Sequence, residues 1–474
     1  MDRTPIYSAI KAYIKEDSSR FHMPGHIGGH GLIEELHFIA SLDVTEVPGL
    51  DDLHIPSQAI LEARKLLSNA YNAEDSLFLV NGATSGIHTL FLSLSPDASV
   101  LIPRNAHRSF FAGMVLSGAW PIYVPPWIDK DSGIAVSVTP GEIYCSLQAN
   151  PRLEAVFLTS PSYYGTTSDI KAIAKITKQH NKLLYIDEAH GGHFPFHAEY
   201  PPAALSNGAD AVVNGLHKTL PVLNQGAVLH GSLQAPWTKI ESAFSLLTTT
   251  SPSYPILVSL DLAREFMMTS GESLLEQSML LSRRYKNRIS TIKGFKCLNE
   301  ELFTLPGVTG VDPLKVLIRI ENSSLNGFML SDLLRSEHNI QVELAEERVI
   351  LAIMSIFHGA EEWEKLYQAL KIIAAKYQKT SGSNMPMELP PWPEVVFSPR
   401  QAYFAPKRRV LFSKCQGQIA GEIVAVYPPG IPCLLPGERI SPEIFDYLQY
   451  IKDTKRRVQG LMDPHLNYIN IIEG

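Results

Sequence analysis

The sequence has few cysteines and no excess of basic residues, and each shortage excludes a class of protein. Its four cysteines, Cys145, Cys297, Cys415 and Cys433, lie far apart and show neither the CxxC nor the CxxH spacing of a zinc site. We therefore expect reduced, mostly structural thiols. Lysine and arginine total 41 against 48 aspartates and glutamates, a formal net charge of −7. Because a surface that neutralises nucleic-acid phosphates needs the opposite sign, we expect no nucleic-acid role.

Long apolar runs are also missing. No stretch of about 18 uncharged apolar residues occurs, so we expect no membrane span. Near the N-terminus, Lys11, Lys15, Glu16 and Asp17 interrupt the apolar pattern too early for the hydrophobic region of a signal peptide. A cytoplasmic protein is the expectation.

What the sequence does contain suits a large folded protein. Of its 474 residues, 45% are hydrophobic and 19% are charged, which is within the globular range. Between about residues 60 and 235, short apolar runs alternate with stretches long enough for helices, a pattern that predicts an α/β fold with a mostly parallel sheet. The runs expected as strands are 76–80, 99–103, 121–125, 155–160, 183–187 and 211–215.

Changes in composition divide the chain into five expected segments. A helix followed by a loop rich in glycine and proline forms an N-terminal arm at residues 1–40, ahead of a large α/β domain at 41–294. Strand and helix patterns predict a smaller α/β domain at 295–378. A stretch rich in serine, glycine and proline at 379–393 is expected to be a linker, and residues 394–474 a C-terminal domain.

A motif of small residues, NGATSG at 81–86, follows one predicted strand and opens a helix. These residues would let backbone N–H groups and the Thr84 and Ser85 hydroxyls approach an anion at the helix N-terminus, and a phosphate would suit such a site. The simpler alternative is a helix cap with a tight turn. The motif matches neither nucleotide-binding glycine loop, so it gives nucleotide binding no support.

Carboxylates end the strand at 183–187 and start the loop after it. Asp187 and Glu188 come where the apolar run stops, at the edge where open α/β sheets bind ligands, although an aspartate there could also cap the loop. Three nearby histidines, taken alone, could suggest a metal site. Glycine and proline between them remove the helix that would fix such a geometry, so we expect no metal. These histidines are His190, His193 and His197.

Lys218 follows the strand at 211–215, with His217 beside it. A lysine near apolar walls and another cationic group has a lowered pKa, which makes its amine competent for a Schiff base, whereas an exposed loop lysine is the alternative. The small-residue motif, Asp187 and Lys218 each follow a predicted strand and should converge on one edge of a parallel sheet. A lysine, a carboxylate for the pyridine nitrogen and an anion pocket are what a pyridoxal phosphate site needs. His107, after another strand, could cover the ring.

At these residues the chain resembles the Orn/Lys/Arg decarboxylase family, pyridoxal-phosphate enzymes with the aspartate-aminotransferase fold. In length it is similar to the compact branch found in Gram-positive bacteria. The matching motifs span nearly the whole chain. They are FHMPGH at 21–26, DVTEVPGLDDLHIP at 43–56, FLVNGATSG at 78–86, RNAHRS at 104–109, SPSYYG at 160–165, DEAHGGHF at 187–194, LHKTLP at 216–221, TTTSPSYPI at 248–256 and YPPGIPCLLPGE at 427–438.

The resemblance implies roles for the catalytic residues. Lys218 would form the Schiff base with pyridoxal 5'-phosphate, Asp187 would pair with the pyridine nitrogen, and His107 would stack on the ring. Proton delivery to Cα after carbon dioxide departs would come from Lys218 or from His190.

It also implies binding residues on both sides of a subunit boundary. Ala83, Thr84 and His217 would hold the phosphate, and Thr249 would reach the phosphate of a neighbouring subunit. A homodimer would then be the minimal active unit. Glu438 is the candidate for receiving the distal cation of the substrate, and a solvated loop glutamate is the alternative.

The implied reaction is decarboxylation of a basic amino acid, arginine or lysine ahead of ornithine, to its amine and carbon dioxide. Two alternatives stay open. An aminotransferase of the same fold would need an arginine for the α-carboxylate, and Arg319 is the candidate. A catalytically silent regulator that binds pyridoxal phosphate is the other, because Gly215 stands where relatives usually carry a serine that donates to the phosphate.

Overall fold

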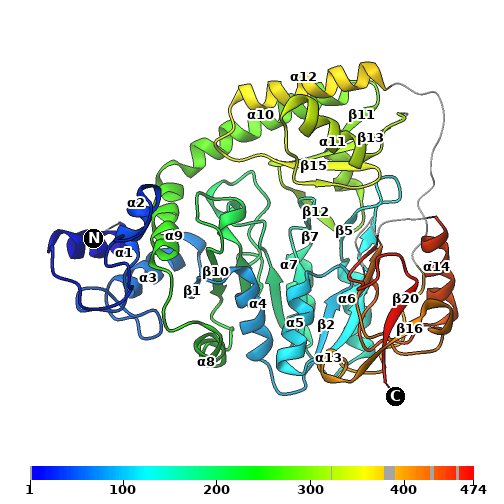
Figure 1. The fold of residues 1–474 in the computed structure, drawn as a ribbon, viewed down its shortest axis with the longest axis horizontal. Coiled ribbons are helices and arrows are strands. Elements are labelled where there is room, and N and C mark those ends of the chain that lie inside the picture. The colour runs from blue at the N-terminus through cyan, green and yellow to red at the C-terminus, as the bar shows by residue number, and fades with distance from the viewer. Residues whose placement is uncertain (1–2, 322, 378–389, 427–431, 455–457, 474) are drawn as a thin grey trace.

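The computed structural model describes residues 3–321, 323–377, 390–426, 432–454 and 458–473. In Figure 1 a central sheet lies between an N-terminal extension, a smaller sheet and a C-terminal unit. No helix in these ranges is long and apolar enough to cross a membrane.

The central sheet has seven strands. In spatial order they are β1 (Asp75–Leu79), β10 (Ala227–Gly231), β9 (Ala211–Asn214), β8 (Leu183–Asp187), β6 (Leu153–Thr159), β2 (Ser99–Pro103) and β3 (Trp120–Val124). Six strands run in one direction, and β10 alone opposes its neighbours β9 and β1. The predicted α/β class with a mostly parallel sheet is confirmed, and each of the six predicted apolar runs overlaps a strand.

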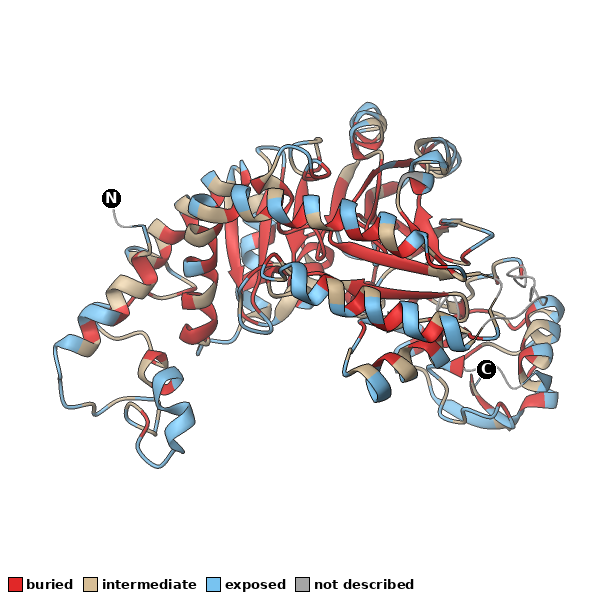
Figure 2. Cartoon of the chain, turned by 90° about the horizontal axis from the view of Figure 1, so that it is seen from above, coloured by how far each residue is buried: buried red, intermediate tan, exposed pale blue. Residues whose placement is uncertain are grey.

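Helices bury both faces of this sheet, which explains why its strands are continuous apolar runs rather than alternating ones. Along β8, the Tyr185 side chain enters the core on the face covered by α4 (Gly82–Leu92) and α5 (Arg108–Ser117), where Phe91 and Phe110 lie. Leu184 and Ile186 point to the opposite face, toward α6 (Pro140–Ala149) and α7 (Ile170–Gln179). Figure 2 shows the resulting buried centre between partly exposed helices.

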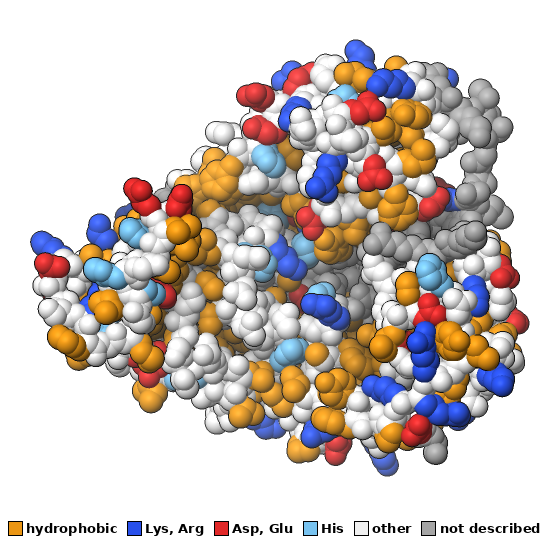
Figure 3. Space-filling view, viewed as in Figure 1, with side chains coloured by type: hydrophobic (Ala, Val, Ile, Leu, Met, Phe, Trp, Pro, Cys, Tyr) orange, Lys and Arg blue, Asp and Glu red, His pale blue; other side chains and the backbone are white. Residues whose placement is uncertain are grey.

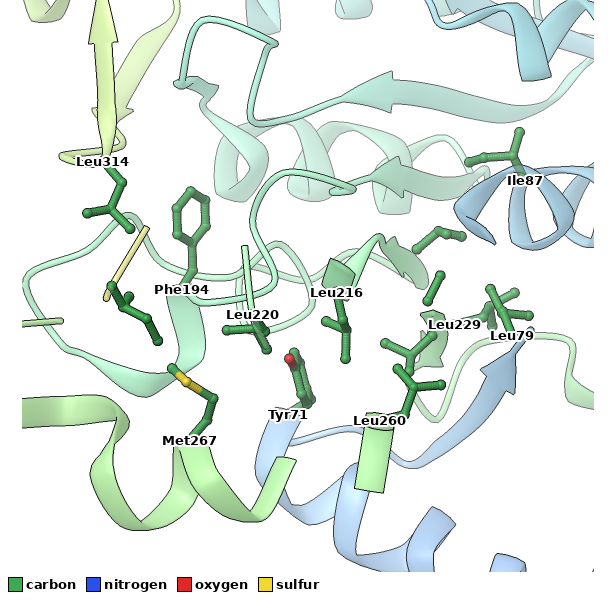
Figure 4. Close-up of a cluster of buried hydrophobic side chains, with 14 of the residues drawn as sticks. Tyr71, Leu79, Ile87, Phe194, Leu216, Leu220, Leu229, Leu260, Met267 and Leu314 are labelled. Carbon is green, nitrogen blue, oxygen red and sulfur yellow. The ribbon is translucent and has the colours of Figure 1, made fainter. Parts of the chain in front are cut away.

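A buried cluster joins segments that are distant in the sequence (Figure 4). Tyr71, at the end of α3 (Ala59–Tyr71), lies among Leu216 and Leu220, which follow β9, and Leu260 on α9 (Tyr254–Phe266). The Tyr71 hydroxyl donates to the carbonyl of Gly192 at 2.7 Å. The core is therefore tied directly to the loop that follows Asp187.

The predicted N-terminal helix is α1 (Pro5–Lys15), which packs on α3 and α9 through Ile6 and Ile10. A mostly irregular stretch with α2 (His37–Leu42) follows.

A smaller, antiparallel sheet lies above the central one in Figure 1. It contains β11 (Phe295–Leu298), β13 (Lys315–Ile320), β15 (Val349–Ile353) and β14 (Leu344–Ala345), with α11 (Gly327–His338) and α12 (Ala360–Lys376) packed near it. From α9 the chain reaches this sheet through the π-helical turn η4 (Met267–Gly271) and α10 (Glu272–Ser290).

The C-terminal unit has a hydrophobic core of its own. Its elements are α13 (Pro399–Phe404), β16 (Lys407–Leu411), η6 (Phe412–Lys414), β17 (Val424–Val426), β18 (Pro432–Leu434), α14 (Pro442–Asp453), β19 (Val458–Gln459) and β20 (Tyr468–Ile472). Residues 379–389 of the expected linker and residues 427–431 of the proline-rich motif lie outside the described residues.

The remaining elements are short, apart from one helix. They are α8 (Trp237–Leu247), β4 (Trp127–Ile128) paired with β5 (Ala135–Ser137), β7 (Thr166–Ser168) paired with β12 (Val308–Val311), and the 3-10 turns η1 (Glu34–Leu36), η2 (Phe194–Phe196), η3 (Leu216–Lys218) and η5 (Glu300–Thr304).

Candidate active site

A cavity of about 560 Å³ opens where the carboxyl ends of β1, β2, β6, β8 and β9 meet. Figure 3 shows a hollow near the centre of one face, with basic and histidine side chains around it. The structure brings most of the predicted site residues to this cavity. They are Ala83, Thr84, His107, Asp187, His190, His217 and Lys218.

The small-residue motif forms the turn from β1 into α4. Gly82 has a φ of +72°, which a side chain would strain, and its N–H donates to the carbonyl of Gln225 at 2.8 Å. Ser85 is buried and donates to the Gly82 carbonyl at 2.8 Å, so its hydroxyl is used within the turn. Thr84 is exposed and lines the cavity beside Ala83. The helix N-terminus, with its positive dipole end, therefore faces the cavity.

Asp187 and Lys218 both line the cavity and interact electrostatically. Asp187 ends β8, and its Oδ1 accepts from the N–H of Ala189 at 3.1 Å. Burial raises the pKa of Asp187, and the nearby Lys218 amine opposes that rise. Burial lowers the pKa of Lys218, and Asp187 opposes that fall. The pair thus places a carboxylate and a partly desolvated amine in one pocket.

His190 lies between two lysines. Its Nε2 is 3.2 Å from Lys218 Nζ, and its Nδ1 is 3.0 Å from Lys315 Nζ. Burial lowers the pKa of His190 well below its usual value, and the positive charges of Lys315 and Lys218 lower it further. Lys315 was missed by the sequence analysis, because it begins an ordinary-looking strand, β13, in the smaller sheet.

Two further histidines have fixed orientations. His107 caps α5, with its Nδ1 accepting from the N–H of Ser109 at 3.2 Å, so the proton of the neutral ring is on Nε2. Burial lowers the pKa of His107. His217 Nδ1 is 3.0 Å from the carbonyl of Gly226, to which it donates, and this leaves Nε2 for a ligand.

Glu188 is a structural residue. Its carboxylate accepts from the N–H of Ala204 at 2.7 Å and from Asn214 Nδ2 at 3.0 Å. Burial raises the pKa of Glu188 to about 8, so it carries a proton at neutral pH.

The histidines that the sequence grouped as a conceivable metal site have separate partners. His193 Nε2 lies 3.2 Å from Asp312 Oδ1, and His197 Nε2 lies 2.9 Å from Glu276 Oε2. His190 contacts the two lysines instead.

Glu438 lies in a buried ion pair outside the cavity. Glu438 is 1% exposed and does not line the cavity. Both of its carboxylate oxygens bond the guanidinium of Arg104, one of them at 2.8 Å, and the N–H of Leu435 donates to the same carboxylate at 2.7 Å. The Glu438 oxygens are thus paired within the subunit, and the role of Glu438 in receiving the distal cation of the substrate stays a prediction that this pairing does not support.

Two other sequence candidates lie outside the cavity. Thr249 is exposed, and its carbonyl accepts from His54 Nε2 at 2.9 Å. Its reach toward a neighbouring subunit stays a prediction. Arg319 pairs with Glu321, whose Oε1 is 3.0 Å from its Nε, and with Asp131. The arginine that an aminotransferase would need is therefore not supplied by Arg319.

Gly215 lies in a closely packed part of the site. A Cβ at this position would lie 3.1 Å from the carbonyl oxygen of Ala189 and 3.4 Å from Lys218 Cδ. The first distance is closer than ordinary van der Waals contact, so the Ala189 carbonyl would have to move by a few tenths of an ångström to accept a side chain here. Gly215 therefore fits this closely packed site without such a shift, and its presence is not by itself a sign of lost function.

Comparison with known families decides the assignment. Residues 4–362 match the model of the Orn/Lys/Arg decarboxylase major domain, and residues 385–464 match that of the family's C-terminal domain. The chain belongs to the Orn/Lys/Arg decarboxylase family. It is therefore a decarboxylase, as the resemblance implied.

Full-length relatives of this decarboxylase are known. The arginine decarboxylase of Bacillus subtilis (strain 168) is 33% identical over 99% of this chain and 98% of its own. The lysine decarboxylase LdcA of Pseudomonas aeruginosa is 21% identical over 96% of this chain and 77% of its own. The solved structure of lysine decarboxylase A from Pseudomonas aeruginosa has a TM-score of 0.85 at 19% identity, covering 99% of this chain and 80% of its own. At that identity the likeness concerns the fold.

Proposed function

We propose that this decarboxylase converts arginine to its amine and carbon dioxide, with pyridoxal phosphate carried on Lys218. The supporting observation is the convergence of a buried carboxylate, Asp187, a lysine amine, Lys218, and the N-terminus of α4 on one cavity. Arginine is favoured because the relative named for it is 33% identical, against 21% for the lysine decarboxylase. Lysine is the second candidate.

The donor set fits the cofactor. The cavity of about 560 Å³ is within the usual range for small-molecule sites. When bound, pyridoxal phosphate supplies an electron sink for the bond to the departing carboxylate. Asp187, held by the Ala189 N–H, would keep the ring nitrogen protonated. The N-terminus of α4 with Ala83 and Thr84, and His217 through its Nε2, would bind the phosphate.

Two groups are placed to handle protons. Lys218 is tethered beside the cavity by the short turn η3, and His190 is in contact with its amine at 3.2 Å. Either can donate a proton at the substrate Cα once carbon dioxide has left. His107, whose ring is held by Ser109, would cover the cofactor ring on one side.

The active form is proposed to be a cytoplasmic homodimer or a larger homo-oligomer. Large apolar side chains of the N-terminal extension are exposed, with Phe21 at 99%, Ile55 at 76% and Phe38 at 72%. Exposed apolar surface of this kind is typical of an interface between subunits. The four cysteines are all unpaired, which agrees with a reducing compartment.

One experiment tests the cofactor attachment. The holo-protein is reduced with borohydride, digested, and mapped by mass spectrometry. We expect the pyridoxyl label on the peptide that carries Lys218. Label on another lysine, or on none, would refute the proposal.

A second experiment tests the reaction. Carbon dioxide release is measured from arginine, lysine and ornithine, together with keto-acid formation. We expect carbon dioxide, fastest from arginine. Keto acid would support the aminotransferase, and a yellow protein that releases no amine would support the silent regulator.

A further inference from the structure

Lys218, His190 and Lys315 form a continuous chain of nitrogen atoms. The two contacts, 3.2 Å to Lys218 and 3.0 Å to Lys315, use both ring nitrogens of His190. Lys315 is 1% exposed and lies behind His190, outside the cavity lining. This lysine has no part in the proposed chemistry described so far.

The number of hydrogen-bond donors and acceptors limits the total charge that Lys218, His190 and Lys315 can carry together. An ammonium group can only donate hydrogen bonds, and a neutral imidazole accepts at one nitrogen and donates at the other. If both lysines were charged, one of them would face an N–H of His190 with no acceptor between them. Both contacts can be hydrogen bonds only when the three groups together carry at most one positive charge, because a neutral amine can either donate or accept. At least one of the two lysine amines is therefore neutral.

The surroundings favour the charge on Lys315. Asp312 lies beside Lys315 and raises the pKa of that amine, although burial lowers it overall to about 8. Asp187 is the corresponding anion for Lys218, but burial raises the pKa of Asp187. Against the effect of burial, His193 and Lys315 help to lower the pKa of Asp312, so Asp312 is the stronger anion in the cofactor-free protein. With Lys315 charged, it donates to Nδ1, the His190 proton is on Nε2, and the Lys218 amine accepts it.

Other groups act on the cluster from the packed elements around it. Glu343 attracts both lysines, His107 and His217 repel a charge on His190, and the Tyr163 ring contacts His190 with centroids 4.9 Å apart.

We propose that Lys315 is a positioning residue that acts through His190 to hold the Lys218 amine unprotonated and ready to take up the cofactor. The inference rests on the proposed function, in which Lys218 carries the cofactor. Lys315 begins β13 of the smaller sheet, and a Cβ on Gly165 would lie 2.6 Å from its Cγ, so its stem is tightly enclosed. A residue of the smaller sheet thereby affects the protonation state of the Lys218 amine in the cavity.

The test uses the full-length protein after cofactor removal. Formaldehyde with cyanoborohydride methylates unprotonated amines, and mass spectrometry follows the rate at the Lys218 peptide from pH 6 to pH 10. The test variant is Lys315→Met. The matched control is Lys286→Met, because Lys286 is also fully buried with a pKa lowered to about 8 by burial, and it lies on α10.

We expect Lys315→Met to slow methylation of Lys218 at pH 7 about tenfold, since one pKa unit changes the unprotonated fraction by that factor. Lys286→Met should leave the rate unchanged. An unchanged rate in Lys315→Met, or an equal fall in Lys286→Met, would overturn the proposal. The borohydride mapping of the holo-protein is independent, so either proposal can fail alone.

If Lys315→Met does not fold, the proposal can still be tested by NMR of His190 in the parent protein. In cofactor-free protein labelled with 15N-histidine, the His190 resonances are assigned by their loss in His190→Asn. We expect a neutral ring with its proton on Nε2 at pH 7. A proton on Nδ1, or a doubly protonated ring, would contradict the proposal.

Discussion

Arg104 and Glu438 are 334 residues apart in the chain and form a buried ion pair in which both guanidinium Nη atoms meet both carboxylate oxygens. Arg104 also donates through Nε to the carbonyl of Pro432 at 2.9 Å and lies 4.7 Å from the Tyr123 ring. Burial raises the pKa of Glu438, and the guanidinium opposes that rise. Because Arg104 precedes His107 by three residues, this pair connects the C-terminal unit to the loop that covers the proposed cofactor position.

Breaking this pair should affect stability more than substrate binding. Glu438→Gln leaves Arg104 charged, buried and half-paired, so we expect a loss of about 3 kcal/mol in urea unfolding. The KM for arginine should stay within about twofold of the original value. The control is Glu394→Gln, whose partner Arg439 is exposed, with an expected loss below about 1 kcal/mol. A stable Glu438→Gln protein with a strongly raised KM would support the substrate-binding role.

Replacing Asp187 and replacing the adjacent Glu188 by their amides should have different effects on activity. Asp187→Asn keeps an acceptor for the Ala189 N–H but removes the charge proposed to face the ring nitrogen, so carbon dioxide release should fall about a hundredfold or more. Glu188→Gln resembles the protonated acid that burial already favours, with a pKa of about 8. Activity at pH 7 should therefore be close to that of the parent. Equal losses in the two variants would contradict the assignment of Asp187.

Acid should destabilise the fold partly through His230. This side chain stacks on Tyr71 with ring centroids 4.2 Å apart, and its Nδ1 is 2.7 Å from Ser76 Oγ. Burial lowers the pKa of His230 from 6.5 to about 3. Between these values the unfolded chain binds a proton that the folded chain does not, so stability falls as pH falls, by about 1.4 kcal/mol per unit.

In His230→Phe the stack on Tyr71 can persist, and Ser76 keeps its bond from Ser68. Urea unfolding at pH 7.5 and pH 5.5 should therefore show a smaller loss on acidification than in the parent. The same loss in both proteins would mean that His230 is not the group responsible.

Asp51 should stabilise the start of α3. Its carboxylate accepts backbone N–H groups of Ser57 at 2.9 Å, Gln58 at 2.8 Å and Ile60 at 2.9 Å. Burial raises the pKa of Asp51, but these bonds outweigh burial and lower it. Asp51→Asn should lose about 2 kcal/mol at pH 7.

The difference between Asp51→Asn and the parent should narrow as the pH falls through the folded pKa of Asp51, because the parent carboxylate then becomes protonated. Asp52→Asn is the neighbouring control, since the Asp52 side chain accepts from the His54 N–H. We expect it to lose less than about 1 kcal/mol. A larger loss in Asp52→Asn than in Asp51→Asn would refute the capping role.

Local sequence patterns were sufficient to predict six of the seven strands of the central sheet and one edge of the site. Asp187 and Lys218 could be placed because each follows an apolar run, and parallel strands end at the same edge. Lys315 and the Arg104 partner of Glu438 could not be placed this way. Both depend on how distant segments pack together, and no spacing within one segment contains that information. The strand β10 and its antiparallel direction were likewise not predicted.

The reversal of β10 has a mechanical consequence. β9 and β10 are adjacent and antiparallel, so the chain between Asn214 and Ala227 turns back at the cavity edge instead of crossing the sheet. Gln225 in this turn accepts the N–H of Gly82, and Gly226 accepts His217. The segment that presents Lys218 and the segment that starts α4 are thus hydrogen-bonded into one rigid piece. The distance between Lys218 and the N-terminus of α4 is therefore set by the central sheet, and a molecule bound at both places must match that distance.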